Sequence, residues 1–115
     1  MLSTSKQDLL NCLAILEAIE KIEQYVQKHP SAEKWMNDQQ CFDACLMNFV
    51  LIGEMTVKMS IDFLEQNKNI EWYKIKAFRN IIAHDYFGID YKEVWQIIQS
   101  KLPELKIKIK QITGK

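Results

Sequence analysis

Hydrophobic residues recur every three or four positions along the first part of the chain. From about Ser5 to His29 these positions are Leu9, Leu13, Leu16, Ile19, Ile22 and Val26. This is the period of one face of an α-helix, and Pro30 ends the helix because the residue before a proline is disfavoured in helical geometry. Ser31 then predicts the N-cap of a short helical turn. We therefore expect one long helix followed by a short one.

A second amphipathic segment begins near Asp38 and ends near Met59. Its apolar stripe consists of Phe42, Cys45, Leu46, Phe49, Ile52 and Met55. Gly53 interrupts the centre of this helix at a cost of about 1 kcal/mol relative to Ala, so we expect another helix to pack closely against it. Ser60 predicts a cap for one more short turn, which ends near Leu64. The methionines expected to fill the core are Met47, Met55 and Met59.

The C-terminal half predicts two further helices. After a loop at residues 67–70, one begins near Glu71, and its apolar face consists of Trp72, Ile75, Phe78 and Ile82. Residues 90–93, DYKE, form a capping-box sequence that opens the next helix, whose apolar face consists of Val94, Trp95, Ile98 and Leu102. Pro103 is expected to restart or kink the chain. Residues 106–112, KIKIKQI, alternate as a strand would, but no partner strand is evident, so we expect a helix there.

Length and composition agree with a helical protein. The chain has 115 residues with 3 Gly and 2 Pro, which leaves few sites for the many turns of a β-fold. A chain of this length fits one domain, residues 1–115, whose core needs no disulfide or metal. The expected fold is all-α, an antiparallel bundle of four to five helices.

The sequence predicts neither export nor membrane insertion. The first ten residues lack the apolar stretch of a signal peptide, and no apolar run approaches the roughly 20 residues that span a bilayer. We expect a cytoplasmic protein, and an odd number of cysteines, 3, argues against a disulfide framework. Cys41 and Cys45 raise the alternative of a metal site. Two more ligands would be needed, and neither His29 nor His84 is obviously placed to help, so we expect buried structural cysteines and no metal.

The chain carries no net charge, but its two parts differ. Residues 1–65 contain five Lys and ten acidic residues, a net charge of −5, whereas residues 66–115 contain nine Lys, Arg79 and five acidic residues, a net charge of +5. This asymmetry suggests an anionic partner for the basic part, or contact between unlike parts in an oligomer. Ordinary solvated helix faces explain it equally well.

Residues 78–90, FRNIIAHDYFGID, contain Arg79, the only arginine, and His84, one of 2 histidines. On an ideal helix these positions lie about 140° apart, whereas Asn80 and His84 lie about 40° apart and share a face. Arg79 and His84 can cooperate in three ways. The helix ends near Ala83, the long arginine side chain swings round, or a second copy of the motif completes the site.

An arginine and a histidine together suit phosphodiester cleavage. A guanidinium binds phosphate through two parallel hydrogen bonds and stays charged, and an imidazole exchanges protons near neutral pH. In RNA the 2′-hydroxyl is a built-in nucleophile, so the reaction requires no metal. The spacing alone is weak support, because an arginine that pairs with a carboxylate and a histidine that ends a helix give the same pattern.

Arg79, His84 and Tyr86 also satisfy a longer pattern: arginine, four residues, histidine, one residue, tyrosine, with Asn80 as a polar residue after the arginine. This pattern resembles that of the HepT-like toxins, small helical proteins of the HEPN superfamily. The flanking residues are similar too: Trp72, then FGID at 87–90, VW at 94–95 and LPELK at 102–106. LIGE at 51–54 and LLNCLAILEAIEKIEQY at 9–25 resemble the family's second and first helices, so the resemblance covers nearly the whole chain.

The resemblance implies a HEPN-like fold and a metal-independent endoribonuclease that cleaves cellular RNA. It implies a homodimer in which two Arg-x4-His motifs meet in a composite cleft. It also implies an antitoxin partner, a nucleotidyltransferase of the MNT type, which in the family transfers AMP from ATP to the motif's tyrosine, here Tyr86. The chain would then be the toxin of a type II- or VII-like toxin–antitoxin system, and AMP on Tyr86 would block the cleft and compete for Arg79.

The same resemblance suggests a role for each motif residue. Arg79 binds the scissile phosphate and His84 is the general acid or base. Asn80 orients the phosphate or holds His84, and Tyr86 shapes the cleft and accepts the modification. Glu54 matches the family's IGE sequence, although pairing with a basic residue explains it better. The tail lysines either contact RNA or simply favour solubility, the stronger interpretation; they are Lys106, Lys108 and Lys110.

Other candidate residues favour structural roles. His29 is expected to interact with a helix C-terminus, and three residues are expected in the core or at an interface: Trp35, Trp72 and Trp95. No phosphate-binding loop is evident, so the chain is not expected to bind ATP or another cofactor by itself. A second class of function stays open, that of a noncatalytic dimeric subunit that binds nucleotide or RNA and scaffolds a nucleotidyltransferase.

Overall fold

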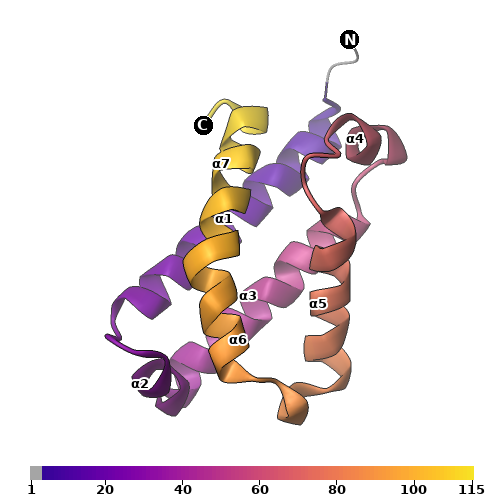
Figure 1. The fold of residues 1–115 in the computed structure, drawn as a ribbon. Helices are drawn as coiled ribbons and strands as arrows, with labels where there is room; N and C mark the ends of the chain where they lie inside the picture. Colours follow the sequence, from indigo (N-terminus) through magenta and orange to yellow (C-terminus); the bar gives the residue numbers. More distant parts are fainter. Residues whose placement is uncertain (1–3) are drawn as a thin grey trace.

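Serine and aspartate side chains mark where the first helices begin. The computed structural model describes residues 4–115, and over that range it contains helices and no strand (Figure 1). The helices α1 (Lys6–Gln27), α2 (Ala32–Asn37), α3 (Gln39–Val57) and α4 (Ile61–Gln66) are capped in turn by Ser5, Ser31, Asp38 and Ser60. Each cap accepts a hydrogen bond from the backbone N–H three residues further on. The first ten residues were expected to lack the apolar stretch of a signal peptide. Residues 1–3 of that segment lie outside the described residues.

The C-terminal part is a helix that continues through a proline. After α5 (Trp72–His84) and the 3-10 turn η1 (Tyr86–Gly88) come α6 (Tyr91–Gln96), the π-helical segment η2 (Ile97–Lys101) and α7 (Leu102–Thr113). Pro103 was expected to restart or kink the chain; it does not restart it, and the helix instead contains a π-helical segment just before the proline. The Leu102 N–H donates to the Ile97 carbonyl, five residues back, in a turn wider than that of an α-helix. Pro103 then lies in the first turn of α7, where the backbone N–H that proline lacks is not required. The segment 106–112 is helical, as predicted.

Asp90 caps α6, but the expected capping box is not formed. The Asp90 Oδ1 accepts from the N–H of Lys92 at 3.0 Å, two residues on. Within the described part of the chain, no hydrogen bond returns from the Glu93 side chain to the backbone of Asp90. An aspartate cap serves either the second or the third helical N–H, and here the short side chain serves the second. The predicted start of the helix is nevertheless confirmed.

α3 is the central helix of the bundle. Consecutive long helices run antiparallel, with α3 packed between α1 and α5, and α7 returning against α1 (Figure 1). Their apolar faces meet in one core, whose fully buried members include Ile15, Ile19, Ile22, Trp35, Cys45, Ile52 and Ile109. Trp72 is buried as well, and Trp95 packs against Trp35 with ring centroids 5.5 Å apart. The predicted all-α antiparallel bundle and the structural role of the tryptophans are confirmed.

The apolar character of α3 follows from its central place. By length and composition alone its 19 residues, with a mean hydropathy of 1.2, would suffice to cross a membrane, which the sequence was not expected to contain. In the bundle, 44% of that stretch is buried inside the protein. A helix covered on two sides by α1 and α5 must be apolar around much of its surface. The composition of α3 is thus the one that a core helix requires.

A buried aspartate joins the start of α1 to the start of α4. Asp8 is 3% exposed. Its Oδ1 accepts from the Ser60 N–H at 2.9 Å, and its Oδ2 accepts from the hydroxyls of Ser60 at 2.6 Å and Ser5 at 2.9 Å. Burial alone would raise the pKa of Asp8, but these hydrogen bonds outweigh it and lower the pKa. The ionised carboxylate therefore holds the two helix ends together.

Candidate active site

The crossing of α3 and α5 positions Arg79. The backbone of Gly53 faces the Arg79 side chain so closely that a β-carbon on Gly53 would overlap Cβ and Cγ of Arg79. The expectation of close helix packing at Gly53 is therefore confirmed, and the neighbour is the arginine itself. Phe49 and Phe78 pack edge to face beside the crossing, with ring centroids 5.1 Å apart. Arg79 is thus held at its stem by the backbone of α3.

Glu54 is the carboxylate partner of Arg79. The Nη1 of Arg79 donates to the Oε1 of Glu54 at 2.9 Å, and the two side chains are 24% and 44% exposed. This is the pairing that the sequence favoured for Glu54. The Nε of Arg79 is buried and has no hydrogen-bond partner within residues 4–115. The guanidinium is therefore not saturated by its own chain, although a buried donor without a partner is costly.

His84 and Asn80 face outward. His84 is the last residue of α5, so the helix ends one residue beyond Ala83. Both side chains are exposed, whereas Arg79 leans toward α3, and no hydrogen bond joins Arg79 to His84 in the described part of the chain. Of the three ways in which Arg79 and His84 could cooperate, one requires the helix to end near Ala83, and it does end there. It does not by itself bring the imidazole to the guanidinium.

Tyr86 reaches back from η1 to the start of α3. Its hydroxyl accepts from Gln39 Nε2 at 2.9 Å and donates to Asp43 Oδ1. The hydrogen bond to Asp43, burial and the charge of that carboxylate together raise the pKa of Tyr86. Gln39 and Asp43 were missed in the sequence, because two polar residues four apart are common on any helix and their partner lies more than forty positions away.

One face of α3 carries the carboxylates that bond to Tyr86 and Arg79. Helical spacing aligns Asp43, Met47 and Glu54 on this face. Met47 is 66% exposed, so its expected place in the core is wrong. The reason is that Met47 lies on the side of α3 that points away from the core formed with α1 and α5. Phe87, next to Tyr86, is 98% exposed. Exposed apolar side chains therefore accompany the motif residues.

His29 does not act simply as a helix-end residue. α1 ends at Gln27, and the His29 side chain bonds instead to Asp38, with Nε2 and Oδ2 3.0 Å apart. Cys41 lies beside this pair, and it is buried, as expected. Cys45 is buried one turn further on. The expectation that His29 stands apart from the cysteines is wrong, because the loop after α1 folds back over the start of α3.

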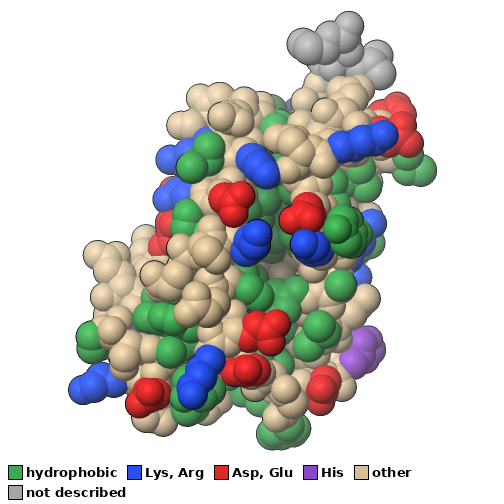
Figure 2. Space-filling view, viewed as in Figure 1, with side chains coloured by type: hydrophobic (Ala, Val, Ile, Leu, Met, Phe, Trp, Pro, Cys, Tyr) green, Lys and Arg blue, Asp and Glu red, His purple; other side chains and the backbone are tan. Residues whose placement is uncertain are grey.

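The tail lysines and an apolar cavity lie away from the motif. Lys106 pairs with Glu23 at 2.7 Å, and Lys108 donates to the Asn69 carbonyl at 2.7 Å, so both have partners in the chain. A cavity of about 290 Å³ opens between α3, α5 and α7, with an apolar floor and a charged rim (Figure 2). Its lining includes Phe78 but none of the motif residues. The motif residues therefore lie outside this cavity.

The fold and the motif together define a class of protein, an all-α HEPN-like bundle with an Arg-x4-His-x-Tyr sequence at a helix end. The family model described as “Ribonuclease HepT-like” matches residues 15–112. The chain therefore belongs to the HepT-like ribonuclease family. No solved structure shows a significant match to it.

Curated relatives carry names of the same kind. “Putative RNase MJ1380” of Methanocaldococcus jannaschii is 31% identical over 89% of this chain and 94% of its own length. “Probable ribonuclease HepT” of Thermococcus cleftensis is 29% identical over 94% of this chain and 96% of its own length. “Gamma-glutamylcyclotransferase and putative RNase MJ0434” of M. jannaschii is 31% identical over 85% of this chain, which spans only 44% of that longer protein.

Proposed function

We propose that this chain is a metal-independent endoribonuclease and the toxin of a toxin–antitoxin pair. The observation that carries the proposal is a guanidinium that is held in place but not saturated. Arg79 gives one terminal nitrogen to Glu54, and its Nε has no partner in the described chain. An exposed imidazole, His84, lies five positions on. The names of the relatives, which refer to RNA cleavage, agree with this assignment.

The reaction is an attack of the RNA 2′-oxygen on the neighbouring phosphorus. His84 accepts the 2′-hydroxyl proton as the new P–O bond forms, or donates a proton to the 5′-oxygen as the old bond breaks. Arg79 donates hydrogen bonds to the non-bridging oxygens and stabilises the charge that grows on them. The products are a 2′,3′-cyclic phosphate and a 5′-hydroxyl. The Asn80 amide, on the same helix face as His84, orients the phosphate or the imidazole.

A homodimer supplies what one chain lacks. Within one chain Arg79 and His84 point to different faces, so we assign the second half of the cleft to another copy of the motif. A dimer in which the exposed faces of α3 and η1 meet would cover Met47, Leu51 and Phe87, which are 66%, 39% and 98% exposed. Burial of such apolar surface favours association. The two motifs would then bring the Arg79 of one chain and the His84 of the other to one phosphate.

Tyr86 is the proposed site of control by a nucleotidyltransferase antitoxin of the MNT type. Its hydroxyl already donates to Asp43, so that carboxylate is placed to take the proton when the phenolic oxygen attacks the α-phosphorus of ATP. AMP becomes attached to Tyr86 and pyrophosphate leaves. The added phosphate brings negative charge beside the motif, where it competes with RNA for Arg79. Incubation with such a partner and ATP should add one AMP to the wild-type mass and none to Tyr86→Phe.

The decisive experiment is RNA cleavage by purified protein whose mass shows no AMP, in the presence of EDTA. We expect cleavage by the wild type, and a rate at least about 100-fold lower for His84→Ala, because positioned acid–base groups contribute 10²–10⁴-fold. Gln99→Ala, at an exposed position of η2, serves as the control. Cleavage by His84→Ala at the wild-type rate would remove the acid–base role.

A noncatalytic subunit is the second candidate. It is favoured by the Glu54 pairing of Arg79 and by the lack, within residues 4–115, of a hydrogen-bonding group that orients His84. In this case the AMP-free protein would bind RNA or nucleotide and cleave no RNA offered. Binding without cleavage, and binding that survives in His84→Ala, would establish this function instead.

A further inference from the structure

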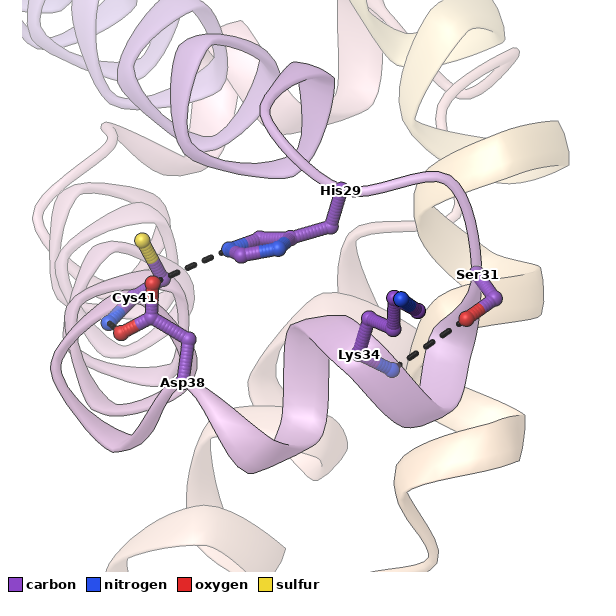
Figure 3. Close-up of polar contacts among 5 residues, drawn as sticks. All are labelled: His29, Ser31, Lys34, Asp38 and Cys41. Atoms are coloured by element: carbon purple, nitrogen blue, oxygen red, sulfur yellow. Dashed lines mark hydrogen bonds and ion pairs between the residues drawn. The ribbon is translucent and has the colours of Figure 1, made fainter.

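Three potential metal ligands converge at the corner where α1, α2 and α3 meet. Figure 3 shows His29 in the loop after α1, Asp38 between α2 and α3, and Cys41 in the first turn of α3. The His29 Nε2 and Asp38 Oδ2 are 3.0 Å apart, and the ligand atoms of all three residues lie within 4.8 Å of one another. They are neighbours because the short helix α2 turns the chain back over the start of α3.

The donor set has the chemistry of a zinc site. It combines an imidazole nitrogen, a carboxylate oxygen and a sulfur, all of which Zn²⁺ accepts at about 2.0–2.3 Å in a tetrahedral arrangement. Ca²⁺ and Mg²⁺ require oxygen ligands and do not fit a site with sulfur and nitrogen. The side chains of His29 and Asp38 are 18% and 38% exposed, so an ion can reach the site and a water can complete its coordination.

The hydrogen bonds already present leave room for an ion. Asp38 uses Oδ1 to cap α3 through the Cys41 N–H at 3.3 Å, and Oδ2 to meet His29. A cation between His29, Asp38 and Cys41 takes the place of the single His29–Asp38 bond while the Oδ1 cap remains. It also adds a bond to the Cys41 sulfur.

We propose that His29, Asp38 and Cys41 bind one Zn²⁺ ion, with a water as the fourth ligand, in a structural site separate from Arg79 and His84. The ion ties the end of α1 to the start of α3. Its consequence reaches the motif, because Asp38 directly precedes Gln39, which donates to the Tyr86 hydroxyl. Zinc therefore steadies the corner against which Tyr86 rests, without taking part in RNA cleavage.

The test is a titration of chelator-treated full-length protein with Co²⁺ and then Zn²⁺. Co²⁺ should produce a thiolate-to-metal charge-transfer absorption at a stoichiometry of one, and Zn²⁺ should abolish it by replacement. Zn²⁺ at about a hundred times its Kd should raise Tm by roughly 10 °C. In Cys41→Ala the absorption should be lost, and in His29→Asn the Co²⁺ affinity should fall more than about tenfold. Cys45→Ala, the buried cysteine one turn away, should bind as the wild type does.

Two outcomes would overturn the site: no charge-transfer absorption in the wild type, or an absorption that persists in Cys41→Ala. If Cys41→Ala does not fold, His29→Asn decides, because His29 lies in a partly exposed loop and an unchanged Co²⁺ affinity there contradicts the proposal. The result is independent of the ribonuclease assignment. Removal of zinc should lower Tm while RNA cleavage, measured well below Tm, continues.

Discussion

The aliphatic part of the Arg79 side chain is fixed by packing, whereas its guanidinium has donors without a partner in the described part of the chain. The stem lies against the Gly53 backbone, one terminal nitrogen donates to Glu54, and Nε has no partner within the described residues. A phosphate that replaced or shared Glu54 would meet a guanidinium already aimed by packing, so little side-chain entropy would be lost on binding. The importance of this residue for the proposed cleavage therefore lies in its planar shape as much as in its charge.

Replacement of Arg79 by Lys tests that argument. Lysine keeps the positive charge but offers one flexible ammonium group in place of a planar fork. We expect kcat/KM for RNA cleavage to fall by about 100-fold, with Tm changed by only a few degrees. The measurement is steady-state cleavage with circular dichroism as the control for folding. Wild-type kcat/KM in the lysine variant would mean that charge alone suffices.

At the scale of helices, two contacts set how the elements meet. Gly53 lets α5 approach α3, and Asp8 joins the starts of α1 and α4. The first contact needs the absence of a side chain, and the second needs a charge kept inside the protein. Neither residue is favourable by itself, because glycine weakens a helix and burial disfavours an ionised carboxylate. Both departures are explained by a neighbouring element.

Gly53→Ala should lower the free energy of unfolding by about 1–3 kcal/mol, because the new methyl group overlaps Arg79 and forces α3 and α5 apart. Helix propensity alone predicts the opposite, a gain of about 1 kcal/mol. Met47, exposed on the same helix, supplies the control: its Ala variant should be more stable than its Gly variant. Urea unfolding measures the stability of all three variants, and a more stable Gly53→Ala protein would contradict the close approach.

Asp8→Asn should lower the free energy of unfolding by about 1–3 kcal/mol at pH 7, because the amide cannot accept three hydrogen bonds. The lowered pKa of Asp8 means that its stabilisation is present above the ordinary value of 3.8 and is lost as pH falls through the lowered value. The difference in stability between the wild type and the variant should therefore begin to narrow as pH falls below 3.8, and it should close only below the lowered pKa. Glu65→Gln, at an exposed position of α4, should have little effect at either pH. A gap that stayed constant from pH 7 to pH 3 would argue against the ionised carboxylate.

The whole molecule presents its motif beside an incompletely covered helix face. α3 packs against α1 and α5, yet its residues Met47 and Leu51 remain exposed. Phe87, which directly follows Tyr86, is almost fully exposed. Exposed apolar residues grouped around polar motif residues are typical of an interaction surface. In one chain Arg79 and His84 lie on different faces. The proposed dimer would use this surface to bring them together in one site.

Mixing two inactive variants tests the shared site. Arg79→Ala and His84→Ala each lack one side chain that the proposed cleavage requires, but a hybrid of the proposed dimer contains one intact Arg79 and one intact His84 from different chains. We expect the unfolded and co-refolded mixture to recover a measurable fraction of wild-type cleavage, whereas each variant alone recovers none. Native mass spectrometry shows whether hybrids form. Hybrid dimers without cleavage would contradict a cleft that needs only one residue of each kind.

The sequence by itself determined the helices and the motif. Helical periods, the caps at Ser31 and Ser60, and the order of Arg79, His84 and Tyr86 are local, since each depends on residues within a few positions of one another. Even the tight packing at Gly53 was evident, because a glycine in a helix centre has a cost that only a neighbour explains. These parts of the prediction agree with the structure.

Only the tertiary structure decided which distant residues meet. The bond from Tyr86 to Asp43, the exposure of Met47 and the gathering of His29, Asp38 and Cys41 all depend on how α2 and η1 turn the chain back. No local pattern specifies those turns. Which face of a helix is covered by other elements depends on the packing of the whole core. The physical division is thus between backbone preferences, which act over one or two helical turns, and side-chain packing, which acts across the bundle.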